Sequence, residues 1–143
     1  MNTADCTFCK IVSGELPASK VYEDSDTLAF MDINPIIKGH ILVIPKKHYN
    51  PITATPPEIL KRLIVSVQKM VEAQMVALQA DGVDVVQVNG KAAGQIIPHI
   101  HFHVIPRFKN DGHSFNWSPR SYANMDEMQE FAERIRNKLV QAL

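Results

Sequence analysis

The chain has 143 residues, of which 45% are hydrophobic, and its 15 basic residues balance its 15 acidic residues. This length and apolar content predict one compact domain with a hydrophobic core. The balanced charge argues against a nucleic acid polymer or an anionic membrane surface as partner. Because no stretch reaches the roughly 20 apolar residues of a membrane span and the polar start lacks a signal-peptide core, we expect a cytoplasmic protein.

A C-x-x-C motif, Cys6-Thr7-Phe8-Cys9, opens the chain, and one or two helical turns should follow it as far as Gly14. In a reducing compartment we expect free thiols rather than a disulfide. Three interpretations stay open from the local sequence: two zinc thiolates, two small buried side chains, or a redox pair. Zinc would need two further ligands, and only distant histidines could supply them.

Residues 20–23 and 27–31 read as two strands joined by a polar turn, which predicts a hairpin. Asp32 follows the second strand at once and could simply cap a turn. Residues 40–45 form a nearly continuous apolar run, typical of a strand that is buried on both faces. His40 stands at the head of that run, and we expect it to be hydrogen-bonded because an unpaired buried imidazole is costly.

A long helix is predicted over residues 56–78, with Thr55 as its cap and apolar side chains at every third or fourth position. Residues 83–89 read as another strand. A loop of small residues, 90–95, leads from this strand to three closely spaced histidines. Such a loop lets backbone N–H groups approach an anion, so we interpret it as a candidate phosphate cradle.

His99, His101 and His103 alternate with apolar residues, which gives residues 99–107 the period of a strand. The three imidazoles would then share one face while the apolar residues face a core. His99 and His103 would lie roughly 13 Å apart at their α-carbons, which disfavours one zinc ion bound by all three. The row suits an extended substrate better, with His101 at the reacting atom and the outer two holding flanking groups.

After Arg107 the chain becomes polar and rich in turns, and this loop carries the one tryptophan, Trp117. A C-terminal helix should follow, because Asn124 and Glu127 form a capping-box pattern. The predicted fold is α+β: a single domain over residues 1–143, with a core at about 6–108 and a loop and helix at 109–143. We expect an antiparallel sheet of about five strands with one long central helix.

Residues 99–105 resemble the H-φ-H-φ-H-φ-φ signature of the histidine triad (HIT) nucleotide-binding family. The similarity extends to residues 39–48 and 89–95, and residues 6–17 are similar to the opening of the bacterial-type members. Together these motifs span about residues 6 to 108. The resemblance implies a HIT-like fold with a half-barrel-like antiparallel sheet, paired across a two-fold axis into a homodimer.

The resemblance also implies hydrolysis or transfer at the α-phosphate of a nucleotide, through a covalent nucleotidyl-histidine on His101. The implied substrates are purine nucleotide conjugates: nucleoside phosphoramidates, related mononucleotide conjugates or dinucleoside polyphosphates. No organic cofactor is implied. Two alternatives stay open, a nucleotide-binding regulatory protein with slow turnover and a zinc hydrolase that uses the triad directly.

Further roles are implied residue by residue. His103 matches a contact to the phosphate or leaving group, and His40 matches a partner of the triad. Asp32 matches an acceptor for ribose hydroxyls, with Ile33 beside the base. The contacts implied at the phosphate end of the substrate are Asn89, Gly94 and Gln95.

The resemblance also implies a structural zinc ion, because family members with this C-x-x-C look like they bind zinc through two cysteines and two histidines. The corresponding residues here are Cys6, Cys9, His48 and His99. Such a site would tie the N-terminal turn to the sheet. Two departures limit the resemblance. Ile96 stands where some members place Ser or Thr, and the loop around Trp117 has no firm equivalent.

Overall fold

The structure is a computed structural model that describes residues 3–114 and 117–142. Residues 1–2 of the polar start and residues 115–116 of the loop around Trp117 lie outside the described residues. The chain divides into two compact units, Met1–Asp111 and Gly112–Leu143. Each unit is described by itself.

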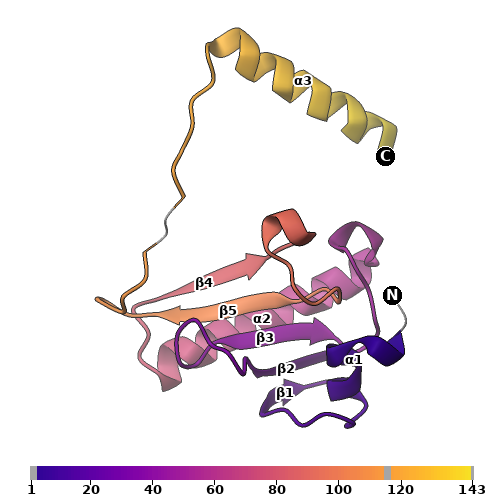
Figure 1. The fold of residues 1–143 in the computed structure, drawn as a ribbon, viewed down its shortest axis with the longest axis vertical. Coiled ribbons are helices and arrows are strands. Elements are labelled where there is room, and N and C mark those ends of the chain that lie inside the picture. Colours follow the sequence, from indigo (N-terminus) through magenta and orange to yellow (C-terminus); the bar gives the residue numbers. More distant parts are fainter. Residues whose placement is uncertain (1–2, 115–116, 143) are drawn as a thin grey trace. The chain divides into compact units, whose positions relative to one another are not determined.

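The first unit is organised around a five-stranded sheet in the order β1-β2-β3-β5-β4, in which every neighbouring pair is antiparallel (Figure 1). This result confirms the predicted fold class and the N-terminal hairpin. The strands are β1 Lys20–Glu23, β2 Thr27–Met31, β3 Ile41–Pro45, β4 Gly82–Gln87 and β5 Phe102–Arg107.

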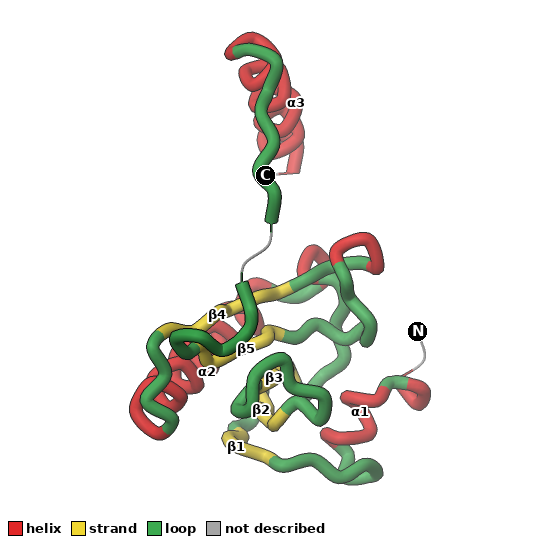
Figure 2. Tube along the Cα trace, turned by 60° about the vertical axis from the view of Figure 1, so that its left-hand side comes forward, coloured by secondary structure: helices red, strands yellow, loops and turns green. Residues whose placement is uncertain are grey.

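Two helices pack on opposite faces of this sheet. The long helix α2, Pro57–Ala77, covers one face (Figures 1 and 2), and the short helix α1, Thr7–Val12, lies against the other. Successive side chains of a strand point to opposite faces, so β2 and β3 serve two cores. Leu28, Phe30, Leu42 and Ile44 pack with α1, whereas Ala29, Ile41 and Val43 pack with α2. The apolar run at 40–45 is therefore buried on both faces, as predicted.

Helix α2 differs from its prediction in two details. Thr55 does not cap it, because the Thr55 hydroxyl donates to the Pro51 carbonyl at 3.0 Å instead. The buried stripe is also narrower than the apolar pattern suggested, since three of its positions are about half exposed: Ile64, Met75 and Leu78.

The strand that carries the histidines begins later than predicted. Strand β5 starts at Phe102, so His99 and His101 precede it. The residues just before β5 bond to a loop rather than to a neighbouring strand. The Ile100 N–H donates to the Tyr49 carbonyl at 2.7 Å. The expected straight row of three imidazoles is therefore wrong, since only the third histidine lies on the strand.

The second unit contains helix α3, Met125–Ala142. Its predicted cap is present: the Glu127 N–H donates to Asn124 Oδ1 at 2.9 Å, and Glu127 Oε1 accepts from the Ala123 N–H at 3.0 Å. Within the described residues, no helix combines the length and apolar content needed to cross a bilayer.

Candidate active site and metal cluster

His101 is buried just before β5, with 5% of its surface exposed. Its Nδ1 lies 2.7 Å from the His99 carbonyl oxygen, and a carbonyl only accepts, so Nδ1 carries the proton. Burial lowers the pKa of His101, and the ring is therefore neutral near pH 7. Nε2 keeps its lone pair, so it is the ring atom that could act as a nucleophile.

Phe8 lies in α1 between Cys9 and the N-cap residue Cys6, and it packs edge-on against His101. The ring centroids lie 5.1 Å apart at an interplanar angle of 87°. The same ring also meets His99 and Phe30, at centroid distances of 5.8 and 5.5 Å. Phe8 thus limits the tilt of the His101 ring. Sequence reasoning missed this residue, although an aromatic side chain inside a C-x-x-C turn was a signal for packing beside the cysteines.

His40 and His103 form a hydrogen-bonded pair. His40 Nδ1 accepts from the Ile36 N–H at 3.2 Å, and burial lowers the pKa of His40, so its neutral ring carries the proton on Nε2. That Nε2 lies 3.0 Å from His103 Nδ1 and donates to it. Burial, together with the neighbouring His101 and His40, lowers the pKa of His103 to about 4. Neutral His103 therefore carries its own proton on Nε2, in a ring 4.9 Å from that of His101.

Asp32 lies at the end of β2, beside this pair. Its Oδ1 accepts from the Asn34 N–H at 2.8 Å, and its Oδ2 lies 3.6 Å from His40 Nε2. The next residue, Ile33, is 91% exposed. The turn after β2 thus presents a carboxylate and an exposed apolar side chain next to each other.

Gln95 holds the loop before the histidines together. Its Oε1 accepts from the Gly90 N–H at 2.8 Å, while its Nε2 donates to Asn50 Oδ1 at 2.7 Å and to the Ile97 carbonyl at 2.9 Å. Both amide hydrogens are used within the protein. Gln95 therefore shapes the loop, and a substrate contact through its NH₂ group would require one of these bonds to break.

Asn89 and Gly94 flank the same loop. Asn89 Oδ1 accepts from the Ile52 N–H at 2.9 Å, which fastens the end of β4 to the segment before α2. Gly94 is exposed and has a φ of 96°, a left-handed conformation that glycine adopts readily. The loop keeps its backbone accessible at Gly94, as a phosphate cradle requires.

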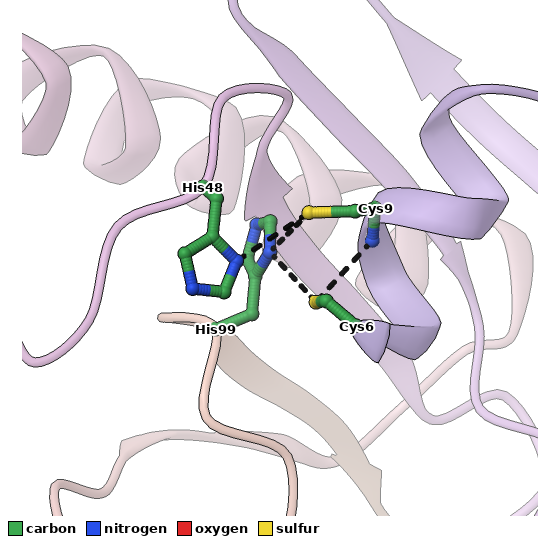
Figure 3. A group of neighbouring side chains, drawn as sticks. All are labelled: Cys6, Cys9, His48 and His99. Carbon is green, nitrogen blue, oxygen red and sulfur yellow. Dashed lines mark hydrogen bonds between the residues drawn. The ribbon is translucent and has the colours of Figure 1, made fainter. Parts of the chain in front are cut away.

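Four side chains form a second cluster next to His101: Cys6, Cys9, His48 and His99 (Figure 3). His99 Nδ1 lies 3.4 Å from Cys6 Sγ and 3.6 Å from Cys9 Sγ, and His48 Nδ1 lies 3.4 Å from Cys9 Sγ. Ligand atoms of a tetrahedral zinc ion bound through sulfur and nitrogen stand about 3.4–3.8 Å apart. The cluster therefore has the dimensions and the donor set of a closed zinc site.

The protonation of this cluster also fits a cation. His99 Nε2 lies 2.9 Å from the Pro45 carbonyl and donates to it, so Nδ1 offers a lone pair to the thiols. Burial lowers the pKa of His99 to about 4, which keeps the ring neutral as a metal ligand requires. Burial and the adjacent Cys6 raise the pKa of Cys9 to about 11. A bound zinc ion would offset this rise by stabilising the thiolate.

Asp32, His40 and His103 form another group with metal-binding side chains. Here the hydrogen bonds oppose a metal ion. His40 Nε2 must carry a proton while Nδ1 accepts from the Ile36 N–H, so a metal at Nε2 would break that backbone bond. The hydrogen bonds of this group therefore fit two neutral imidazoles better than they fit a metal ion.

Of the two roles expected for His99, the structure favours the metal ligand. Both ring nitrogens are engaged, Nε2 by Pro45 and Nδ1 by the thiols. His99 contacts His101 through its backbone carbonyl, which accepts the hydrogen bond from His101 Nδ1. This arrangement also speaks against a zinc ion bound by the triad itself, because the ring of His99 turns toward α1.

The chain matches the HIT domain family over residues 13–110. A HIT-like protein of Methanocaldococcus jannaschii is 46% identical over 86% of this chain and 95% of its own length. An adenosine 5′-monophosphoramidase of Schizosaccharomyces pombe is 36% identical over 94% of this chain and 98% of its own.

Solved structures agree with these matches. A HIT family protein from Bacillus anthracis superposes with a TM-score of 0.86 at 41% identity, over 94% of this chain and 96% of its own. A zinc-bound histidine triad protein from Mycobacterium smegmatis superposes with a TM-score of 0.75 at 42% identity, over 83% of this chain and 86% of its own. A chain with this sheet, this histidine arrangement and these matches belongs to the HIT family.

Proposed function

We propose that the protein hydrolyses nucleoside phosphoramidates, or related nucleotide conjugates including dinucleoside polyphosphates, at the α-phosphate. The observation that carries this proposal is the 2.7 Å hydrogen bond from His101 Nδ1 to the His99 carbonyl, which leaves Nε2 as a free nucleophile in a buried, neutral ring. The relative named as an adenosine 5′-monophosphoramidase supports the choice of substrate class.

In the first step His101 Nε2 forms a bond to phosphorus while the bond from phosphorus to the leaving amine breaks. The leaving nitrogen takes up a proton that comes from solvent, and we propose that His103 assists this transfer, with its Nε2–H donating a hydrogen bond at the leaving group. In the second step water attacks phosphorus, the bond to His101 Nε2 breaks, and the proton that the water releases goes to solvent. His101 returns to its neutral form, and the nucleoside monophosphate leaves.

For the substrate itself we propose that Asp32 accepts from the ribose hydroxyls and that exposed Ile33 packs against the purine base. The loop formed by Asn89, Gly94 and Gln95 would surround the phosphate. We also propose the two-fold homodimer that the resemblance implied, which sedimentation equilibrium at twice the chain mass would support.

For the metal cluster we propose zinc, held by Cys6, Cys9, His48 and His99. A zinc-bound histidine triad relative of 42% identity supports the choice of ion. When bound, the ion would cross-link α1 to the loop before β5 and supply no chemistry to the reaction. His101 and His103 then carry the reaction alone.

The test is a panel of adenosine and guanosine phosphoramidates and dinucleoside polyphosphates, ranked by kcat/KM. We expect turnover, with the highest kcat/KM for the phosphoramidates. In His101→Ala turnover should fall by roughly three orders of magnitude or more, while nucleotide affinity stays within about threefold. Tight nucleotide binding without turnover of any member of the panel would instead favour the regulatory nucleotide-binding protein.

A further inference from the structure

Gln74 is a polar residue in the middle of the apolar face that α2 turns to the sheet. It is 2% exposed, and it continues the buried series of Leu63, Val67 and Met70 at the spacing of a helix. Its Nε2 donates two hydrogen bonds, to the Gly39 carbonyl at 2.9 Å and to the Val104 carbonyl at 2.8 Å. One amide group thus binds two separate segments of backbone.

Each of these carbonyls lies next to a histidine of the hydrogen-bonded pair. Gly39 precedes His40, and Val104 follows His103. The ladder between β3 and β5 ends with the pair Ile41 and Val104, so Gly39 and His40 lie past its end. Gln74 supplies the connection at that point, where the ladder no longer sets the distance between the two histidines.

A side chain at Gly39 would collide with Leu78, the residue that follows α2. Gly39 has a φ of 104°, and a β-carbon there would lie 2.6 Å from Leu78 Cδ1. The Gly39 carbonyl lies within hydrogen-bond reach of the Gln74 amide at this point. A glycine at this position is therefore part of the same connection.

Packing alone does not explain a glutamine here. Gln74 Oε1 is buried and accepts no hydrogen bond from the described residues. A buried acceptor without a partner lowers stability, and a methionine of similar length would avoid that loss. The two donated bonds are therefore what the glutamine adds.

We propose that Gln74 is a positioning residue that holds His40 and His103 at hydrogen-bond distance and thereby sets the rate of proton transfer to the leaving group. The kinetic part rests on the function proposed above. The structural part, that Gln74 maintains the 3.0 Å bond between His40 Nε2 and His103 Nδ1, stands without it.

The test compares Gln74→Met with Ser66→Ala. Ser66 is buried on the same side of α2, and its hydroxyl bonds to the Thr27 hydroxyl at 2.8 Å, away from the histidines. Ser66→Ala therefore controls for the loss of a buried hydrogen bond on this helix. If Gln74→Met does not fold, Gln74→Asn takes its place, because the shorter amide cannot reach both carbonyls.

Two adenosine monophosphate substrates separate positioning from general damage. With an alkylamine leaving group, which must be protonated, kcat of Gln74→Met should fall on the order of tenfold with KM within about twofold. With 4-nitrophenolate, which leaves without a proton, kcat should stay within about twofold of the wild type. Ser66→Ala should resemble the wild type on both substrates. Equal losses on both substrates, or no loss on either, would overturn the kinetic proposal.

Nitrogen-15 NMR of the imidazoles gives a readout that needs no turnover. In the wild type and in Ser66→Ala, His40 and His103 should each show a single tautomer protonated on Nε2. In Gln74→Met both should show mixed tautomers. Unchanged tautomers in Gln74→Met would overturn the positioning role even if the enzyme is active. A wild type that shows the tautomers but no turnover would overturn only the proposed function.

Discussion

Backbone groups set the protonation of three buried histidines. The Pro45 carbonyl fixes His99, the His99 carbonyl fixes His101, and the Ile36 N–H fixes His40. A carbonyl can only accept a hydrogen bond and an amide N–H can only donate one, so each ring has one defined tautomer. As a result one lone pair faces the thiols and another is left for a substrate.

A first prediction concerns His103 and pH. The pKa of His103 is about 6.5 in an unfolded chain and about 4 in the folded protein, mainly through burial. Between these values the unfolded state binds more protons, so the free energy of unfolding should decrease as the pH falls from 6.5 to 4. His103→Asn keeps an acceptor for His40 but does not titrate. Denaturant titrations at fixed zinc should show a shallower pH dependence in His103→Asn than in the wild type, and equal slopes would contradict the assignment.

A second prediction concerns Asp32 and the ribose. A substrate without its 2′-hydroxyl should bind more weakly by roughly 1–3 kcal/mol, because a charged acceptor loses its donor. Asp32→Ala should erase most of that difference. Asp32→Asn keeps the Oδ1 acceptor for the Asn34 N–H and should show an intermediate difference. The measurement is the ratio of dissociation constants for ribo- and deoxyribonucleotides, and an unchanged ratio in Asp32→Ala would remove Asp32 from the ribose site.

The sequence could predict residues whose chemistry is uncommon in a core. The resemblance grouped Cys6, Cys9, His48 and His99 as zinc ligands, and the structure places their ligand atoms within 4.8 Å of one another. Gln74 was missed from the sequence because the spacing of apolar residues was the only guide to the buried face of the helix, and a glutamine does not count toward it. Its signal was position: it lies four residues after Met70 on the buried face, where a polar side chain needs partners.

Among the elements, β5 shows where pattern reading fails. Alternation of histidine with apolar residues predicts one strand from His99, yet the strand begins at Phe102. Alternation reports which side chains are buried, and Ile100 is indeed fully buried. It does not report where the backbone bonds go, and the Ile100 N–H bonds to the distant Tyr49 carbonyl. Tertiary contacts of that kind cannot be read from local sequence.

Helix α1 carries the third prediction. It has only six residues, so it depends on its contacts to the sheet rather than on its own propensity. Purified protein should contain near one zinc per chain, and Cys6→Ser or Cys9→Ser should lose most of it. Thr7→Ala is the control, because Thr7 is exposed in the same turn. Chelation should lower the melting temperature more than the initial rate, and full zinc occupancy in the double cysteine variant would contradict the site.

Across the first unit, the two faces of the sheet support different parts of the site. On one face α1 and its N-cap residue contribute two thiols to the Cys/His cluster, and Phe8 of α1 packs against His101. On the other face α2 reaches His40 and His103 through Gln74 and their neighbouring carbonyls. Predicting the sheet from sequence was feasible because β2 and β3 are apolar on both sides. The side-chain contacts on each face of the sheet depend on three-dimensional geometry, which the spacing of apolar residues does not predict.

The central claim is that His101 carries the nucleotide during turnover. Wild-type enzyme should be mixed with an adenosine phosphoramidate, quenched in alkali within the first turnover, digested and analysed by mass spectrometry. The account predicts a gain of one adenylyl group on the peptide that contains all three triad histidines, with fragmentation placing it on His101 and no gain in His101→Ala. Attachment to His99 or His103, or a wild-type kcat in His101→Ala, would contradict the account.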